Sequence, residues 1–161
     1  MRTSIAVLAA VLWAALAAAQ GMQVSLGALT HDTSQPVEVS ADSLEVDQES
    51  GTAVFSGNVL VVQGDMKLSA GSVRVTYASG DDGGIAELIA LGGVTFVTET
   101  EAAEGREVVY NVDDGTLSFS GDVLLTQGPN ALSGDRMRIN LVDGTAVVEG
   151  RVRTVFQAGE N

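Results

Sequence analysis

One ten-residue phrase occurs twice in this chain. It reads FSGNVLVVQG from Phe55 to Gly64 and FSGDVLLTQG from Phe119 to Gly128, 64 positions later. The agreement extends past the phrase, because the 23 residues from Phe55 to Tyr77 and those from Phe119 to Leu141 are identical at ten positions. A match of this length covers a whole supersecondary unit rather than a loop. The chain is therefore predicted to be built from repeated structural units.

A shorter Gly-x-Val motif marks four such units. Its glycines are spaced by 35, 29 and 29 residues, and they are Gly57, Gly92, Gly121 and Gly150. A unit of about 30 residues holds two or three strands and cannot bury its apolar face alone, so neighbouring units must stack. Glycine inside a strand pattern usually marks a bulge or a bend. A glycine-rich phosphate cradle would need a helix after the loop, and the sequence predicts none there.

From residue 37 onward, apolar residues alternate with polar ones. A period of two places one side of a strand in a core and the other in solvent. The alternating residues are Val37, Val39, Val59, Val61, Val73, Val75, Tyr77, Val94, Phe96, Val108, Tyr110 and Val112. Turn-forming runs such as SGDDGG at 79–84 and VDDG at 112–115 separate these segments. No later stretch has a helical stripe of about ten residues or more, so the chain is predicted to be all-β.

The first 19 residues have the features of a secretory signal peptide. Arg2 precedes an apolar run from Ile5 to Leu16, and Ala17-x-Ala19 offers small side chains for cleavage. The apolar run is shorter than the roughly 20 residues that a membrane-spanning helix needs. We expect cleavage after Ala19 and export of the protein. An uncleaved N-terminal anchor helix is the alternative.

Charge excludes one class of partner. The chain carries eight Lys and Arg against 21 Asp and Glu, a net charge of −13, and removal of Arg2 with the signal takes it to −14. Such an acidic chain binds nucleic acid poorly, because its bulk charge repels phosphates. Cysteine is absent, so the domain has to be stable without disulfides.

Catalytic groups are scarce. His31 is the only histidine and lies in a polar stretch, so neither a Ser-His-Asp triad nor a metal–histidine site is expected. Asp81-Asp82 and Asp113-Asp114 precede glycines in turn contexts, where aspartate serves the backbone geometry. The sequence therefore predicts no enzyme, no catalytic residue, no metal ligand and no cofactor.

Several longer stretches resemble one known family. DTSQPVEVSADSLEVD begins at Asp32, FSGNVLVVQGDMKLSAGSVRVTY at Phe55 and LSGDRMRINL at Leu132. Their order and spacing are similar to those of the lipopolysaccharide-transport periplasmic proteins of the LptA/OstA type. The resemblance implies a twisted, V-shaped antiparallel β-jelly roll of stacked hairpin repeats over residues 36–157. A flexible polar lead-in at 20–35 and a C-terminal tail at 158–161 would flank it.

The same resemblance implies a role, a set of partners and a set of groove residues. Family members form a periplasmic bridge that carries lipopolysaccharide from an inner-membrane ATP-driven export complex to an outer-membrane barrel, with the lipid A acyl chains in an apolar groove. The implied partners are lipopolysaccharide, LptC-like and LptD-like β-jelly roll domains, and further copies stacked head to tail. The implied groove residues are Val37, Val39, Phe96, Tyr110 and Val112, although alternating apolar residues are also what a plain core requires. Glu38 and Asn111, one residue out of register, are expected to face water.

The last repeat indicates where copies would join. DGTAVVEGRVRTVFQ from Asp143 to Gln157 alternates on both sides of Gly150, and only four residues follow it. We expect an open assembly edge at Val148, Val152 and Val155, because unpaired strand edges accept strands from another chain.

Two alternatives to the bridge role remain open on the sequence. One is a membrane-anchored, LptC-like relative in the same pathway, which would keep its N-terminal helix. The other is a structural β-solenoid or adhesin fragment. The basic residues are spread along the chain, so no cluster of them forms a phosphate clamp.

Overall fold

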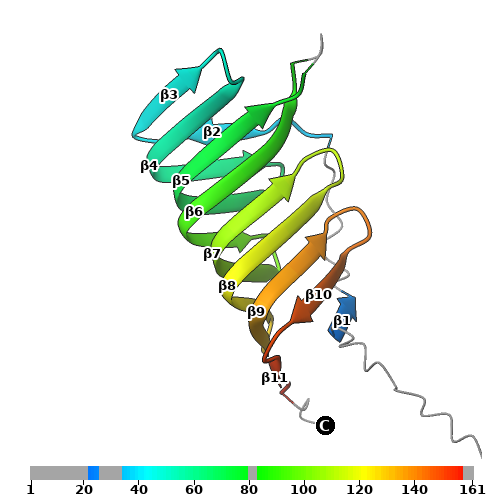
Figure 1. Cartoon of the computed structure of the whole chain (residues 1–161). Coiled ribbons are helices and arrows are strands. Elements are labelled where there is room, and N and C mark those ends of the chain that lie inside the picture. The colour runs from blue at the N-terminus through cyan, green and yellow to red at the C-terminus, as the bar shows by residue number, and fades with distance from the viewer. Residues whose placement is uncertain (1–21, 26–33, 80–82, 158–161) are drawn as a thin grey trace, which may run out of the picture.

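A computed structural model describes residues 22–25, 34–79 and 83–157, and over these residues the chain is all-β (Figure 1). Eleven strands pair antiparallel in one sheet. They are β1 (Met22–Ser25), β2 (Glu38–Ser40), β3 (Ser43–Asp47), β4 (Thr52–Gln63), β5 (Met66–Tyr77), β6 (Ile85–Val97), β7 (Glu101–Asn111), β8 (Thr116–Gln127), β9 (Asn130–Asn140), β10 (Thr145–Glu149) and β11 (Arg153–Val155). The predicted fold class is thereby confirmed.

The sheet is a ladder of hairpins with two ends. Strands β4 to β9 pair in chain order. At one end, β2 and β3 pair with the two halves of β4. At the other end, β10 and β11 pair with the two halves of β9. Figure 1 shows the long strands bending in the middle, so that the two halves of the sheet face each other across a V.

The four repeated glycines make these bends, as the sequence predicted. Each has a positive φ, with values of 80°, 86°, 81° and 76° at Gly57, Gly92, Gly121 and Gly150. The residue after each glycine also has a positive φ, and the register of β4, β6 and β8 shifts at that point. Two residues on one strand then face one on its neighbour, which is a β-bulge that turns the strand. The recurring motif is therefore the corner of the V.

Polar side chains bind across this corner at matching places in the repeats. The Nδ2 of Asn58 donates to Oδ2 of Asp42 at 2.8 Å, and an Nη of Arg151 lies 2.6 Å from Oδ1 of Asp135. Asp122 forms an ion pair with Arg106 in the same way. The Arg151 guanidinium holds the pKa of Asp135 below its usual value by donating a hydrogen bond to it. Because these pairs are solvent-exposed, they fix geometry more than they add stability.

The core fills the space between the two halves of the sheet. Buried side chains alternate with exposed ones along each long strand, for example along β5, as expected for strands with one covered face. The largest fully buried residues include Tyr110, Phe96, Phe119 and Leu117. No other hydrophobic layer is needed, because the bent sheet covers its own apolar face.

The N-terminal region differs from its prediction in one respect. Strand β1 lies inside the segment predicted as a flexible lead-in, and it pairs with β10. Residues 1–19, with the predicted cleavage site, lie outside the described residues, as do His31, Asp81, Asp82 and the tail at 158–161. In the described part of the chain, no helix is long and apolar enough to cross a membrane.

Candidate functional site

The five predicted groove residues come together on the inner face of the V. Phe96 and Tyr110 are fully buried, with 0% and 2% exposure. Val37, Val39 and Val112 are partly buried and pack against the same core. Of the two residues expected to face water, Glu38 is exposed and Asn111 is half-buried. The apolar interior is thus continuous from β2 to β7.

Opposite halves of the sheet meet at the centre of this interior. Phe96 follows the bend of β6, and Phe119 precedes the bend of β8. Their rings pack edge to face, an arrangement that aromatic rings favour because of their quadrupoles. The interior is therefore closed by side chains at this level.

Hydrogen bonds join the end of β7 to the end of β4 at the side of the V opposite its corner. The Tyr110 hydroxyl donates to Oε1 of Gln63 at 2.8 Å, and Nε2 of Gln63 donates to the backbone carbonyl of Gln35 at 2.8 Å. Tyr110 lies at the end of β7 and Gln63 at the end of β4, on opposite halves of the V. Burial raises the pKa of Tyr110 to about 12. The pair acts as a polar latch across the mouth of the V.

A second polar cluster lies on the rim of the V at the other repeat. Glu101 is 4% exposed, and its carboxylate accepts hydrogen bonds from the hydroxyls of Thr98 and Thr100 and from Nε2 of Gln127. These partners satisfy a buried carboxylate that would otherwise be costly. Gln127 occupies the place in the second phrase that Gln63 occupies in the first. The repeated glutamine therefore forms a hydrogen bond in both units, with Tyr110 in the first and with Glu101 in the second.

Sequence reasoning did not single out Gln63 or Glu101. The available signal was the glutamine that ends both repeated phrases at an inward-facing position of the alternation. A polar residue repeated at such a position predicts a buried hydrogen bond. Its partner lies 47 residues away in one case, which the repeat alone does not reveal.

The β2–β3 end of the sheet exposes apolar side chains that face the same way as the core. Leu44 and Val46 on β3 lie opposite Phe55 and Ala53 on β4, yet they are 55% and 57% exposed. Among the described residues, β3 pairs only with β4. Its other edge therefore has no strand to cover Leu44 and Val46, and apolar surface is exposed to solvent at this end.

The β10–β11 end only partly matches the predicted assembly edge. Val148 is not on an open edge, because β1 pairs with β10 and places Met22 opposite it. The repeat pattern did not include this strand, which covers the β10 edge in this structure. Val155 lies on β11 and is 62% exposed, and Val152 packs partly against the core just before β11. Within the described residues, β11 pairs on one side only.

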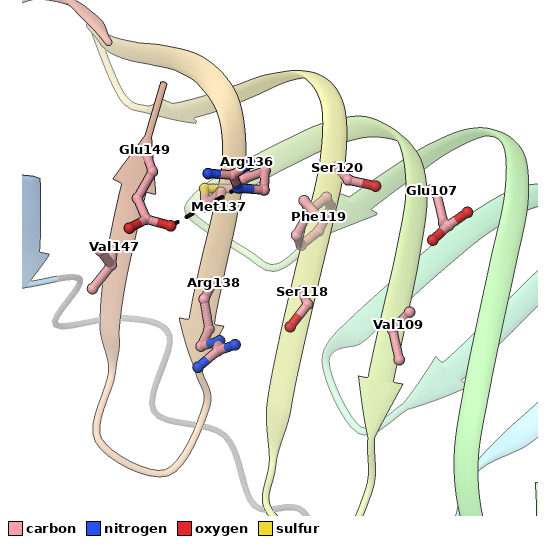
Figure 2. A pocket seen from close by; sticks show the side chains of 10 residues that line it. All are labelled: Glu107, Val109, Ser118, Phe119, Ser120, Arg136, Met137, Arg138, Val147 and Glu149. Atoms are coloured by element: carbon pink, nitrogen blue, oxygen red, sulfur yellow. Dashed lines mark ion pairs between the residues drawn. The ribbon is translucent and has the colours of Figure 1, made fainter. Parts of the chain in front are cut away.

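The outer face carries a separate hollow of about 380 Å³ (Figure 2). It spans β7 to β10, and its lining includes Glu107, Arg136, Arg138 and Glu149. Arg136 and Glu149 form a long ion pair of 4.0 Å across it. Val109 and Val147 line it beside these charged side chains, so its lining is mixed. The interior of the V, in contrast, is lined by a continuous set of buried apolar side chains.

Acidic side chains are the remaining candidates for metal-binding chemistry. No group of three or more His, Cys, Asp and Glu side chains there could hold a metal ion. Asp113 and Asp114 lie in the turn between β7 and β8, where the Asp114 amide donates to Oδ1 of Asn111. They serve the turn, as Asp commonly does.

A bent antiparallel sheet whose two halves enclose a continuous apolar interior defines a β-jelly roll. The comparison with known families agrees. Residues 38–145 match the family model described as LptA/(LptD N-terminal domain) LPS transport protein. The chain belongs to this family of lipopolysaccharide transport proteins.

Several relatives are similar to the chain. The lipopolysaccharide export system protein LptH of Pseudomonas aeruginosa is 30% identical over 129 residues, covering 76% of this chain and 72% of LptH. An uncharacterized protein of Rhizobium meliloti is 30% identical over 160 residues, covering 93% of this chain and 86% of that protein. LptA of Escherichia coli is 39% identical over 56 residues, 35% of this chain and 30% of LptA.

The crystal structure of LptH from Pseudomonas aeruginosa has the same fold. It superimposes with a TM-score of 0.71 at 21% identity, covering 79% of this chain and 99% of that chain. LptH is described there as the LptA-homologous periplasmic component of a conserved lipopolysaccharide transport device.

Proposed function

We propose that this protein binds the acyl chains of lipopolysaccharide in its apolar interior and carries the lipid across the periplasm as one segment of a bridge. The observation that carries the proposal is the continuous inner face of the V, open to solvent at β3 through Leu44 and Val46. Family membership supports the substrate class. The match to the fold of LptH favours it over the structural β-solenoid alternative.

The chemistry of the lipid requires such an interior. Each acyl methylene that leaves water contributes about 0.8 kcal/mol, so a lipid with several chains cannot cross an aqueous space unprotected. An inner face lined by valine, phenylalanine and leucine side chains provides that protection. The acidic outer faces keep the carrier soluble.

Lipid entry requires the two halves of the V to separate. Phe96 and Phe119 occupy the centre of the interior, and Tyr110 and Gln63 bridge its mouth. An acyl chain would displace the aromatic contact and take over the same apolar surface. The half-buried Val39 and Val112, near the rim, would be the first to contact it.

The bridge would form through the strands at the two ends of the sheet, which in the described residues pair on one side only. Strand β3 at one end and β11 at the other offer backbone groups for strand addition. The partners on this proposal are further copies head to tail, an LptC-like domain at the inner membrane and an LptD-like domain at the outer membrane. Cleavage after Ala19 releases the chain into the periplasm, whereas an LptC-like protein would keep its anchor. Mass spectrometry of the N-terminus separates these two cases.

Site-specific photo-crosslinking tests lipid binding. Crosslinkers at Val39 and Val112 should capture lipopolysaccharide in cells, and crosslinkers at the neighbouring Glu38 and Asn111 should not. The two members of each pair are adjacent in the chain, so they differ in which face of the strand they occupy and not in their position along it. Equal capture at both pairs, or none at Val39 and Val112, would contradict the proposed groove.

A further inference from the structure

Strand β1 occupies one edge of the sheet in an ordered register. It pairs antiparallel with β10, with Met22 opposite Val148, Gln23 opposite Val147, Val24 opposite Ala146 and Ser25 opposite Thr145. Ala146 and Val148 are fully buried. A segment that precedes the repeats in the chain thus covers β10, which belongs to the last repeat.

The register of β1 is the one that the next repeat would have. In the preceding hairpin, Phe119 of β8 lies opposite Met137 of β9, and Leu117 lies opposite Ile139. Val148 and Ala146 stand in the places of Phe119 and Leu117, 29 residues later in the repeat. Strand β1 therefore lies on β10 as β9 lies on β8.

The sequence of β1 also matches the strands that take this position. It reads MQVS, where β9 reads MRIN from Met137 and β3 reads LEVD from Leu44. All three follow the pattern apolar, polar, apolar, polar. Leu44 lies opposite Phe55 of the next strand, and Met137 lies opposite Val148 of the next strand. Phe55 and Val148 hold the same place in their repeats, so Leu44 and Met137 are equivalent. In a head-to-tail stack, β3 of a second copy would place Leu44 opposite Val148, where Met22 lies in the monomer.

We infer that β1 is an internal cap, which imitates β3 and occupies the edge of β10 that a second copy needs. This inference rests on the proposed head-to-tail bridge. The cap covers β10 but not β11, which pairs only with β9 in the described residues. A second copy therefore docks β2 on β11 first and then displaces β1 with β3. The advantage of β3 is that Leu44 and Val46, more than half exposed in the monomer, become buried in the stack.

Removing the cap and locking it should have opposite effects on assembly. In the first variant of the mature chain, residues 22–25 are replaced by Gly-Ser-Gly-Ser, with the same replacement at residues 26–29 as the control. In the second, Gln23→Cys and Val147→Cys join β1 to β10 by a disulfide, since these residues are directly opposite and the chain has no other cysteine. Assembly is followed by sedimentation velocity over a concentration series.

The uncapped chain should assemble at a concentration at least tenfold below that of the parent and of the control. The locked chain should stay monomeric until it is reduced. Equal assembly of the uncapped, control and parent chains would overturn the cap while leaving the bridge intact. If circular dichroism shows that the uncapped chain is unfolded, the locked chain decides alone, and its assembly under oxidising conditions would overturn the cap.

A crosslink between copies separates failure of the cap from failure of the bridge. A mixture of Glu45→Cys chains and Val147→Cys chains should give a disulfide-linked heterodimer, because Glu45 of one copy takes the place of Gln23 against Val147 of the other. The uncapped background should raise its yield. If no heterodimer forms and no chain assembles, the head-to-tail bridge is wrong, and the proposal that β1 caps it is wrong as well.

Discussion

Phe96 and Phe119 meet edge to face across the interior, with ring centroids 6.3 Å apart and 73° between the ring planes. One ring follows a glycine bend and the other precedes one, so the contact joins the two halves of the V. The exposed fraction of the side chain is 0% for Phe96 and 2% for Phe119. The pair therefore fastens the two halves of the sheet to each other through the core.

Replacement of Phe119 by alanine should lower the free energy of unfolding by about 3–5 kcal/mol, because a large buried ring leaves a cavity. The matched control is Phe55→Ala, since Phe55 holds the same place in the first repeated phrase but is only partly buried. Urea unfolding monitored by circular dichroism should show the smaller loss for Phe55→Ala. Equal losses would mean that the two repeats pack alike, contrary to the structure.

Tyr110 should make stability depend on alkaline pH. Burial raises its pKa to about 12, whereas an unfolded tyrosine titrates near 10. The folded state therefore holds its proton longer than the unfolded state, and this contribution is complete below about pH 10 and is lost as the pH rises toward 12. Two pKa units correspond to about 3 kcal/mol. The urea concentration at the unfolding midpoint, measured from pH 8 to pH 11.5, should therefore fall as the pH rises above about 10.

The variant Tyr110→Phe should remove most of this alkaline slope. It should also cost about 1 kcal/mol at neutral pH, because the hydrogen bond to Gln63 is lost. Tyr77→Phe is the control, since Tyr77 is 41% exposed and leaves the latch intact. A slope that persists in Tyr110→Phe would show that other groups cause it.

The bends of the V were predictable because they depend on local chemistry. A glycine that recurs within an alternating pattern marks a position where the backbone needs a positive φ. Gly57 and Gly121 carried this signal in the sequence, and both bend their strands. The alternation likewise predicted that Phe96 and Tyr110 face inward, because side chains of a strand alternate regardless of its partners.

The latch and the cap could not be predicted in this way, because both depend on distant partners. Gln63 and Tyr110 meet only after the two intervening strands, β5 and β6, bring the ends of β4 and β7 together. Strand β1 has four residues, too few for a periodic signal, and its partner β10 lies more than 100 residues later in the chain. Short strands gain their structure from the edge that accepts them.

Gly121→Ala should destabilise the domain by about 1–3 kcal/mol, because a side chain at a positive φ of 81° is strained. An added Cβ would also lie 2.9 Å from Cδ of Arg106. Gly84→Ala is the control, since Gly84 lies outside the left-handed region and has open space around it. Thermal unfolding of both variants gives the comparison. A Gly121→Ala chain as stable as the control would show that the bulge tolerates a side chain.

Leu44→Asp should weaken assembly at least tenfold and leave the monomer almost unchanged. Leu44 is 55% exposed, so its replacement should alter the free energy of unfolding by only about 0.5 kcal/mol. In a head-to-tail stack, however, the new carboxylate would lie opposite the buried Val148 of the neighbour without a partner, which is unfavourable. Leu91→Asp provides the control, because Leu91 is 43% exposed on β6, a central strand of the sheet, and adds the same charge away from both ends. Sedimentation velocity should show the Leu91→Asp chain assembling like the parent, while the Leu44→Asp chain needs at least a tenfold higher concentration. If Leu44→Asp assembles like the parent, β3 is not the joining strand, and the register that places Leu44 opposite Val148 is wrong.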